Sequence, residues 1–261
     1  MNQICTYAYY QFKVNIRYKM NNIFSIMSTF VAILVQFYVW KYVEQVEHID
    51  TNIISIYTLF ALTFSILLPI FSSADFISSK ILKGDIAILL QRPQSLLFMN
   101  FGIQCGHVLY RFCYRVLPIW LLYFVFFYKS IYYWDNPQFS ILIILSSLFS
   151  WILSFILGYI VGLLSIQLIS ISGLKSLVSG LLLLFGGGLL PIDLYPVFLQ
   201  KIVLFTPFAS ISYYPVAMLS GIATFNAITA IKIQLFWLAF FSIVLIIVHK
   251  SIYQKIEIMG G

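Results

Sequence analysis

Long apolar runs dominate the pattern of hydrophobic and polar positions along this chain. A helix needs about 20 mostly apolar residues to cross the hydrocarbon core of a bilayer. The pattern predicts six membrane-spanning helices, at residues 21–40, 52–74, 115–128, 138–166, 176–190 and 227–248. The third and fifth are the shortest, and we expect the third to begin before residue 115 because the preceding turns are also mostly apolar.

Composition supports a protein that lies in the membrane. Of 261 residues, 62% are hydrophobic and only 9% are charged, whereas a soluble domain carries about 25% charged residues. So few charges cannot cover a water-exposed surface, so most of the surface is expected to face lipid. The chain lacks a polar stretch long enough for a second, soluble domain. We therefore predict an all-α integral membrane protein in which residues 1–261 form a single transmembrane domain.

The positions of the basic residues predict the orientation. Cytoplasmic segments of membrane proteins carry an excess of Lys and Arg. With the N-terminus inside, 11 of the 15 basic residues fall on the inner side, and four on the outer side: Lys41, Lys129, Lys201 and Lys232. Both termini are therefore predicted to be cytoplasmic. The net charge of +7 follows from this bias, and we expect the lipid bilayer, not nucleic acid, as the partner of these charges.

Two stretches do not fit simple spans, and the first of them is residues 1–20. Lys13 and Arg17 lie four residues apart with Tyr9, Phe12 and Ile16 nearby, which favours a basic amphipathic helix along the inner interface. An ordinary basic flank of the first span is the alternative.

The second stretch, residues 186–221, is apolar but is broken repeatedly. Proline interrupts a helix and glycine permits sharp reversals. Short re-entrant helices that enter the outer leaflet without crossing it would accommodate both residue types, and such backbone must be buried in protein or line a cavity. The breaking residues are Gly187, Gly188, Pro191, Pro196, Pro207 and Pro215.

Catalytic motifs are scarce in this sequence. The three histidines lie far apart, the three cysteines have no metal-ligand spacing, and no GxxxxGK[ST] phosphate-binding loop occurs. The predicted spans also lack an obvious Asp, Glu or His relay of the kind that proton-driven carriers use. We therefore expect no enzymatic activity, metal or cofactor in this chain, and expect the energy for any transport to come from another subunit.

The most polar internal segment is the predicted inner loop at residues 75–95. Its apolar residues recur at near-helical spacing, interrupted by Gly84 and ended by Pro93. An amphipathic cytoplasmic helix of this kind suits docking of a soluble partner. A helix that rests on the inner membrane surface is the alternative.

Several of these segments together resemble ABC-2 type permeases, the membrane subunits of bacterial ABC exporters. The resemblance is carried by the basic N-terminal helix, the Tyr253 to Gly260-Gly261 tail, and the sequences KGDIAILLQRPQS (83–95), GGGLLPIDLYP (186–196) and TPFASISYYPVAMLSG (206–221). It covers nearly the whole chain in the same order. It implies a bacterial inner-membrane location, six spans, a separate cytoplasmic ATPase that binds ATP and Mg²⁺, and pairing with a second permease subunit, identical or related.

The resemblance also implies roles for particular residues. The segment 75–95 would couple to the ATPase through Lys83, Gly84, Asp85, Leu89, Leu90, Arg92 and Pro93. The segment 186–221, with the glycines and prolines named above, would close the outer side of the path. We expect Phe60, Phe64, Phe71 and the fifth span to line that path.

The function predicted in this way is outward movement of a hydrophobic or amphipathic substrate, either a peptide, a lipid or a drug. Two alternatives from other classes are an integral-membrane enzyme that modifies lipids and a non-transporting immunity or assembly protein. The Glu-Ala-Ala motif of ABC importer permeases does not occur here, which favours export.

Overall fold

The described part of the chain consists of helices joined by turns. The computed structural model describes residues 3–47, 51–84, 95–127, 141–166, 168, 171–188 and 190–260. Its α-helices are α1 (Gln3–Ile16), α2 (Lys19–Glu47), α3 (Thr51–Leu67), α4 (Ile70–Leu82), α6 (Leu96–Arg111), α7 (Leu117–Phe126), α9 (Ile141–Leu163), α10 (Ser172–Phe185), α11 (Val197–Leu204), α12 (Tyr214–Ser220) and α13 (Ala227–Gly260). The shorter turns are the π-helical η1 (Phe112–Val116) and η4 (Ala209–Tyr213) and the 3-10 segments η2 (Leu164–Ile166) and η3 (Ile192–Leu194). These ranges contain no strand, which confirms the all-α class.

Five helical stretches are long and apolar enough to cross a membrane. They are Met20–Glu44, Asn52–Leu82, Leu96–Phe126, Ile141–Ile166 and Ala227–Lys250. A sixth results if α11 and the stretch Ala209–Ser220, which meet at 81°, are counted as one broken span. A multi-pass membrane protein of up to six spans is therefore confirmed.

Three of the predicted spans differ in extent from the observed helices. The second continues past its predicted end at residue 74 to Leu82, and the third begins at Leu96. The fifth, predicted at 176–190, is the 14-residue α10, which is shorter than a bilayer crossing. It ends at Phe185 because the glycines that follow form a turn in which Gly187 has φ +70°.

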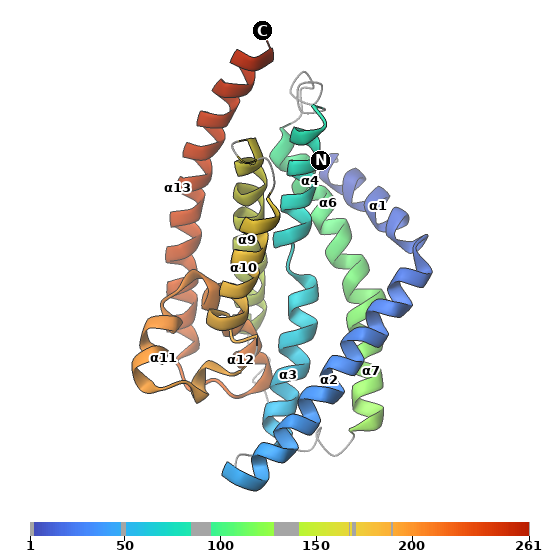
Figure 1. Cartoon of the computed structure of the whole chain (residues 1–261), viewed down its shortest axis with the longest axis vertical. Coiled ribbons are helices and arrows are strands. Elements are labelled where there is room, and N and C mark those ends of the chain that lie inside the picture. Colours follow the sequence, from blue (N-terminus) through green and yellow to red (C-terminus); the bar gives the residue numbers. More distant parts are fainter. Residues whose placement is uncertain are drawn as a thin grey trace.

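The helices α3 and α4 form the centre of the bundle (Figure 1). In the apolar 18-residue part of the stretch Asn52–Leu82, 61% of the residues are buried. The corresponding share is 11% for Met20–Glu44 and also for Ala227–Lys250. Accordingly, α13 and α2 lie on opposite sides of the bundle in Figure 1. The end of α13 and the end of α4 lie in the upper half of that view, and α11 and α12 lie in the lower half. Which end faces the cytoplasm remains a prediction.

Two pairs of glycines bring neighbouring helices into close contact. Gly102 and Gly106 of α6 face the backbone of α1 at Ile4 and Ala8. A Cβ on Gly102 would lie 2.9 Å from the Ile4 carbonyl oxygen. Small residues spaced four apart allow helix backbones to approach in membranes. Gly102 and Gly106 therefore allow α1 to pack directly against α6.

The second pair joins α4 to α9. Gly158 faces the backbone of Ile70, and a Cβ on Gly162 would lie 2.8 Å from the Cβ of Ile77. Ile70 and Ile77 are 1% and 0% exposed. This packing explains why α4 continues past Asp75 even though the segment carries charges: one face of α4 is buried against α9 from Ile70 to Ser78.

The N-terminal segment is a helix distinct from the first span, as predicted. The helix is interrupted at Arg17 and Tyr18, between α1 and α2. The Lys13 ammonium lies 4.4 Å from the centroid of the Tyr9 ring, which holds that cation on the polar face of α1.

Candidate functional site

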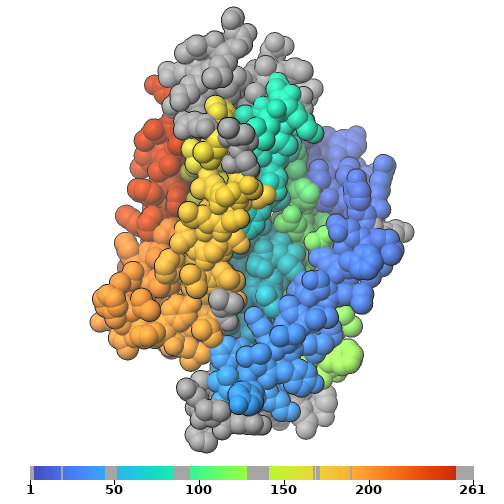
Figure 2. All heavy atoms as spheres, viewed as in Figure 1, coloured from blue at the N-terminus to red at the C-terminus, as the bar shows by residue number. Residues whose placement is uncertain are grey.

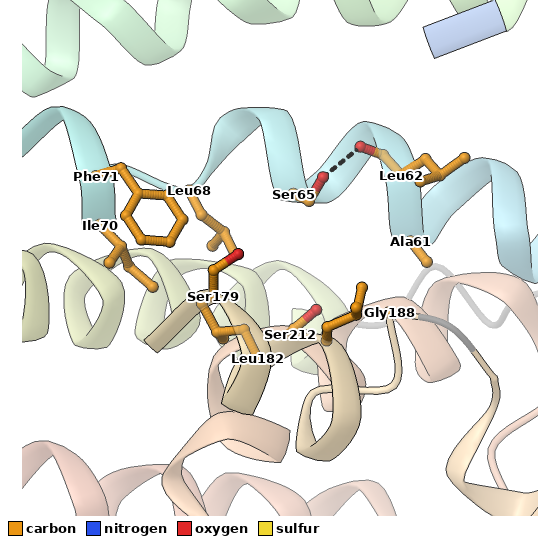
Figure 3. Close-up of a pocket in the computed structure, with 11 residues that line it drawn as sticks. Ala61, Leu62, Ser65, Leu68, Ile70, Phe71, Ser179, Leu182, Gly188 and Ser212 are labelled. Carbon is orange, nitrogen blue, oxygen red and sulfur yellow. Dashed lines mark hydrogen bonds between the residues drawn. The ribbon is translucent and has the colours of Figure 1, made fainter. Parts of the chain in front are cut away.

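A groove of about 360 Å³ lies where α3 gives way to α4 and is walled on the other side by α10 and the glycine turn. Figure 2 shows α10 alongside α3 and α4 on one face of the molecule, and Figure 3 shows the side chains that surround the groove. Its lining residues are Ala61, Leu62, Ser65, Leu68, Ile70, Phe71, Ser179, Leu182, Leu183, Gly188 and Ser212. The walls are thus mainly aliphatic with three serine hydroxyls, a surface suited to an apolar or amphipathic molecule.

The break between α3 and α4 shapes one wall of this groove. Pro69 has no backbone N–H and cannot continue the hydrogen-bond ladder of α3. The carbonyl of Ile66, left near this break, accepts a 3.1 Å hydrogen bond from the guanidinium of Arg111. A cation at the C-terminal end of a helix also interacts favourably with the helix dipole. Arg111 therefore stabilises the backbone break beside the groove.

An ion pair joins the two walls at one end of the groove. The Lys175 ammonium of α10 donates to the Asp75 carboxylate of α4 at 2.6 Å. Asp75 lies one helical turn beyond Phe71, and Lys175 lies one turn before Ser179. Phe71 and Ser179 both line the groove, so the ion pair spans its mouth.

A tyrosine joins the walls at the other end. The Tyr57 hydroxyl of α3 donates a 2.7 Å hydrogen bond to the carbonyl of Gly187. Gly187 adopts φ +70°, and a Cβ at this position would lie 2.5 Å from the Tyr57 hydroxyl. Both the backbone conformation and the lack of space therefore require glycine here.

The broken segment that follows is held by side chains that satisfy its free backbone groups. Tyr214 donates to the Leu204 carbonyl at 2.5 Å and Trp237 to the Phe205 carbonyl at 2.8 Å. Gln234 of α13 donates to the Ser210 carbonyl at 2.9 Å. Irregular backbone at membrane depth requires such partners. The segment is thus fixed to the bundle and does not face lipid alone.

Asp193 is the polar centre of the same segment. Its carboxylate accepts hydrogen bonds from the hydroxyls of Tyr213 and Thr224, the latter at 2.6 Å. Gln200 donates to the Asp193 backbone carbonyl at 2.7 Å. These contacts join η3, α11, η4 and the turn before α13 around one acidic side chain.

Comparison with known proteins decides the family. A family model described as ABC-2 family transporter protein matches residues 48–257. The chain belongs to the ABC-2 transporter family. A search of curated proteins gave no match. As a member of this family, the protein is a membrane permease subunit of an ABC transporter, and ABC-2 permeases transport without being catalytic themselves.

The predicted outer-gate residues of this ABC-2 transporter all lie in or beside the broken segment. Gly187 forms the turn and Gly188 lines the groove. Pro191 precedes η3, Pro196 precedes α11, Pro207 lies between α11 and η4, and Pro215 is buried in the first turn of α12. The structure thus brings these residues together, and their role as a gate remains a prediction.

Of the three phenylalanines predicted to line a path, one lies at the groove. Phe71 lines it. Phe60 is only 1% exposed and packs edge-on against Trp120, with ring centroids 5.4 Å apart. Phe64 packs against the same core cluster as Phe60. These residues are four and seven apart in the sequence, which is helical spacing and does not reveal that the helix breaks between Phe64 and Phe71.

Two of the predicted ATPase-coupling residues are described. Lys83 follows α4 directly, and Gly84 has φ +76° with no atom near a notional Cβ. Asp85, Leu89, Leu90, Arg92 and Pro93 lie outside the described residues. The described part of the segment 75–95 is therefore mostly the end of α4, which leads directly from Lys83 to the groove.

A polar face along α6 is the main feature that the sequence patterns did not predict. Asn100, Gln104, His107 and Arg111 recur at spacings of four, three and four, which is one face of a helix. Gln104 accepts from Ser72 at 2.7 Å and donates to Asn100 at 2.9 Å, and Asn100 donates to the Ser73 hydroxyl at 2.8 Å. This spacing could have identified the face.

The same helix adds detail to the sequence interpretation. Arg111 and Arg115 are among the basic residues predicted on the inner side, and both lie within the helical stretch Leu96–Phe126. Here the cations have polar partners inside the protein, Ile66 for Arg111 and Asn22 for Arg115.

Proposed function

We propose that this ABC-2 permease exports an apolar or amphipathic molecule through the groove between α3–α4 and α10. The proposal rests on one observation: the groove lies between α4 and α10. The helix α4 leads to the predicted ATPase-coupling segment, and α10 leads to the predicted outer gate. The mainly aliphatic lining of the groove suits the acyl chain of a lipid, a hydrophobic peptide or a drug.

The energy would come from a separate cytoplasmic ATPase chain that binds ATP and Mg²⁺, and a second permease subunit, identical or related, would complete the path. In this mechanism the ATPase contacts Lys83 to Pro93 and moves α4 as a rigid lever about the break at Pro69. Because α4 carries Ile70 and Phe71, this motion would change the width of the groove. Rigid-body motions about such hinges are a common way to couple two sites.

The outer end would be closed by the segment 186–221. Tyr57 links this segment to α3, so a motion of α3 relative to α10 would act on the glycine turn. Asp193 and its partners would keep the rest of the segment together while the turn moves.

Two adjacent leucines test the groove. Leu183 lines it and is 46% exposed, whereas Leu184 does not line it and is 51% exposed. In proteoliposomes with the cognate ATPase, Leu183→Trp should fill the groove and reduce transport at least ten-fold, while the matched control Leu184→Trp should transport normally. Equal transport by both variants would exclude this groove as the path.

The coupling segment is tested separately through ATP hydrolysis. Gly84 has a positive φ that a β-branched residue adopts only at a cost, so Gly84→Val should lower permease stimulation of the ATPase without removing the protein from the membrane. Gly180→Val in α10, which also has no neighbour within 4 Å of a notional Cβ, is the control. Unchanged stimulation in Gly84→Val would argue against docking at this segment.

The proposed location is the bacterial inner membrane with both termini in the cytoplasm. Cys5 in α1 is exposed, and Lys201 in α11 is exposed near the other end of the bundle. A membrane-impermeant thiol reagent added to intact spheroplasts should label Lys201→Cys and leave Cys5 unlabelled until the cells are opened. Labelling of Cys5 but not of Lys201→Cys in intact spheroplasts would show that the orientation is opposite to the one proposed.

A further inference from the structure

Two arginines on one face of the third span have no acidic partner in the described part of the chain. Arg111 donates to the Ile66 carbonyl, and the Nε of Arg115 donates to the side-chain oxygen of Asn22 at 2.9 Å. A guanidinium has five N–H donors, so each cation retains donors beyond these bonds. The two residues are four apart, which places them on the same side of the helix, where like charges repel.

Three carboxylates have side chains that the structure describes, and each of them is engaged or distant. Asp75 pairs with Lys175, and Asp193 accepts from Tyr213 and Thr224. Glu44 lies near the far end of α2 from Asn22, about six helical turns away. The charge of the arginine pair is therefore not balanced by these side chains.

Exposed tyrosines and a further arginine lie close to the pair. Asn22, which contacts Arg115, lies in the first turn of α2, directly after the break between α1 and α2. At this break Arg17 is exposed and Tyr18 is 64% exposed, and Tyr114 beside Arg115 is 41% exposed. Tyrosine and arginine concentrate at the membrane–water interface, and basic pockets between helices on the cytoplasmic side bind anionic headgroups.

Arg111 and Arg115 are half-buried, and the aromatic side chains beside them are partly exposed. Tyr114 stacks on Tyr110, with ring centroids 5.2 Å apart. Phe112, between the two arginines, is 39% exposed. An acyl chain can therefore lie along this surface while its phosphate reaches the guanidinium groups.

We propose that the phosphate of an anionic phospholipid binds to the guanidinium groups of Arg111 and Arg115, next to the break between α1 and α2. Asn22 positions Arg115 there, because its side chain accepts from Arg115 and donates to the Tyr114 carbonyl at 2.7 Å. The phosphate would accept charge-assisted hydrogen bonds from both guanidinium groups and relieve their repulsion. It would thereby join α6 to the α1–α2 break. Neither arginine lines the groove, although Arg111 also stabilises the backbone break beside it, and the lipid site does not depend on the proposed transport path.

Native mass spectrometry of the delipidated full chain tests this site with three probes: dioctanoyl phosphatidylglycerol, dioctanoyl phosphatidylcholine and inorganic phosphate. We expect phosphatidylglycerol to bind at least ten-fold more tightly than phosphatidylcholine, and millimolar phosphate not to displace it. Equal affinity for the two lipids would overturn the proposal. Displacement of the lipid by phosphate would assign the site to a soluble anion instead.

Two variants locate the binding. Arg115→Gln removes a cation, and Asn22→Asp places a carboxylate beside Arg115 that competes with the phosphate. Both should lower phosphatidylglycerol affinity about ten-fold, the loss of about 1.4 kcal/mol expected for a charge-assisted contact. Lys201→Gln, an exposed cation of α11, should bind as the parent does. Unchanged selectivity in both Arg115→Gln and Asn22→Asp would place the lipid elsewhere and refute the site.

Discussion

The hydroxyl of Tyr57 hydrogen-bonds the carbonyl of Gly187 across 130 residues of sequence, at 2.7 Å. Tyr57 is 2% exposed, so this bond forms in the protein interior, where an unpaired hydroxyl is costly. It connects the central helix of the bundle to the turn that begins the broken segment.

Replacement of Gly187 should therefore disrupt this connection. Gly187→Ala forces an L-residue into φ +70° and a Cβ against the Tyr57 hydroxyl, and the backbone alone costs about 1–2 kcal/mol. We expect a lower thermal unfolding temperature in detergent and a loss of transport. Gly188→Ala is the control for the unfolding temperature, because its nearest atoms lie 3.6 Å away and no positive φ occurs there. If both variants unfold alike, the turn is not constrained as described.

The packing of α1 on α6 should be sensitive to a single methyl group. In Gly106→Ala the new Cβ would overlap the Ala8 carbonyl oxygen, and overpacking of this kind costs about 1–3 kcal/mol. We expect α1 to separate from α6 and become susceptible to protease.

Gly180→Ala provides the comparison for that experiment. It adds the same methyl group to a helix where nothing lies within 4 Å, and alanine is favoured over glycine in a helix by about 1 kcal/mol. Its stability should be unchanged or higher. A Gly106→Ala variant as resistant as Gly180→Ala would show that α1 is not held by this contact.

The ion pair between Asp75 and Lys175 should matter for transport more than for stability. Lys175 and Asp75 side chains are 29% and 57% exposed, and an exposed pair contributes about 1 kcal/mol or less. Asp75→Lys should change the unfolding temperature little but reduce transport, because the two like charges would push the groove walls apart.

The charge swap completes this test. Asp75→Lys combined with Lys175→Asp restores the attraction and should recover most of the transport lost in the single variant. If the double variant is no better than Asp75→Lys, the two residues act independently and the ion pair does not control the mouth of the groove.

Asp193 should stabilise the outer segment through its hydroxyl donors. Asp193→Ala leaves the hydroxyls of Tyr213 and Thr224 without their acceptor, and a hydrogen bond to a charged group contributes about 1.5–3 kcal/mol. We expect a clearly lower unfolding temperature. Tyr213→Phe should lower the unfolding temperature by less than Asp193→Ala does. In the Asp193→Ala background, Tyr213→Phe should lower it almost no further. Additive losses would show that the two side chains are not coupled.

The sequence by itself determined that this protein lies in the membrane, roughly where most spans fall, that a separate helix precedes them, and that residues 186–221 are broken. These properties follow from local chemistry: apolar length decides insertion, and proline and glycine interrupt helices wherever they occur. The apolar spacing after Asp75 also predicted a helix there, but not that this helix continues α4, because the buried face of α4 is defined by the backbone of α9 at Gly158 and Gly162.

Only the tertiary structure decided which residues meet. Phe60 and Phe71 lie three helical turns apart and resemble each other in sequence, but the break at Pro69 leaves Phe60 in the core and Phe71 at the groove. Arg111 is accommodated in the apolar stretch Leu96–Phe126 because Ile66, 45 residues away in sequence, is adjacent in space and accepts its hydrogen bond. Hydrogen bonds and packing across such separations depend on how the helices assemble, and no local pattern encodes that arrangement.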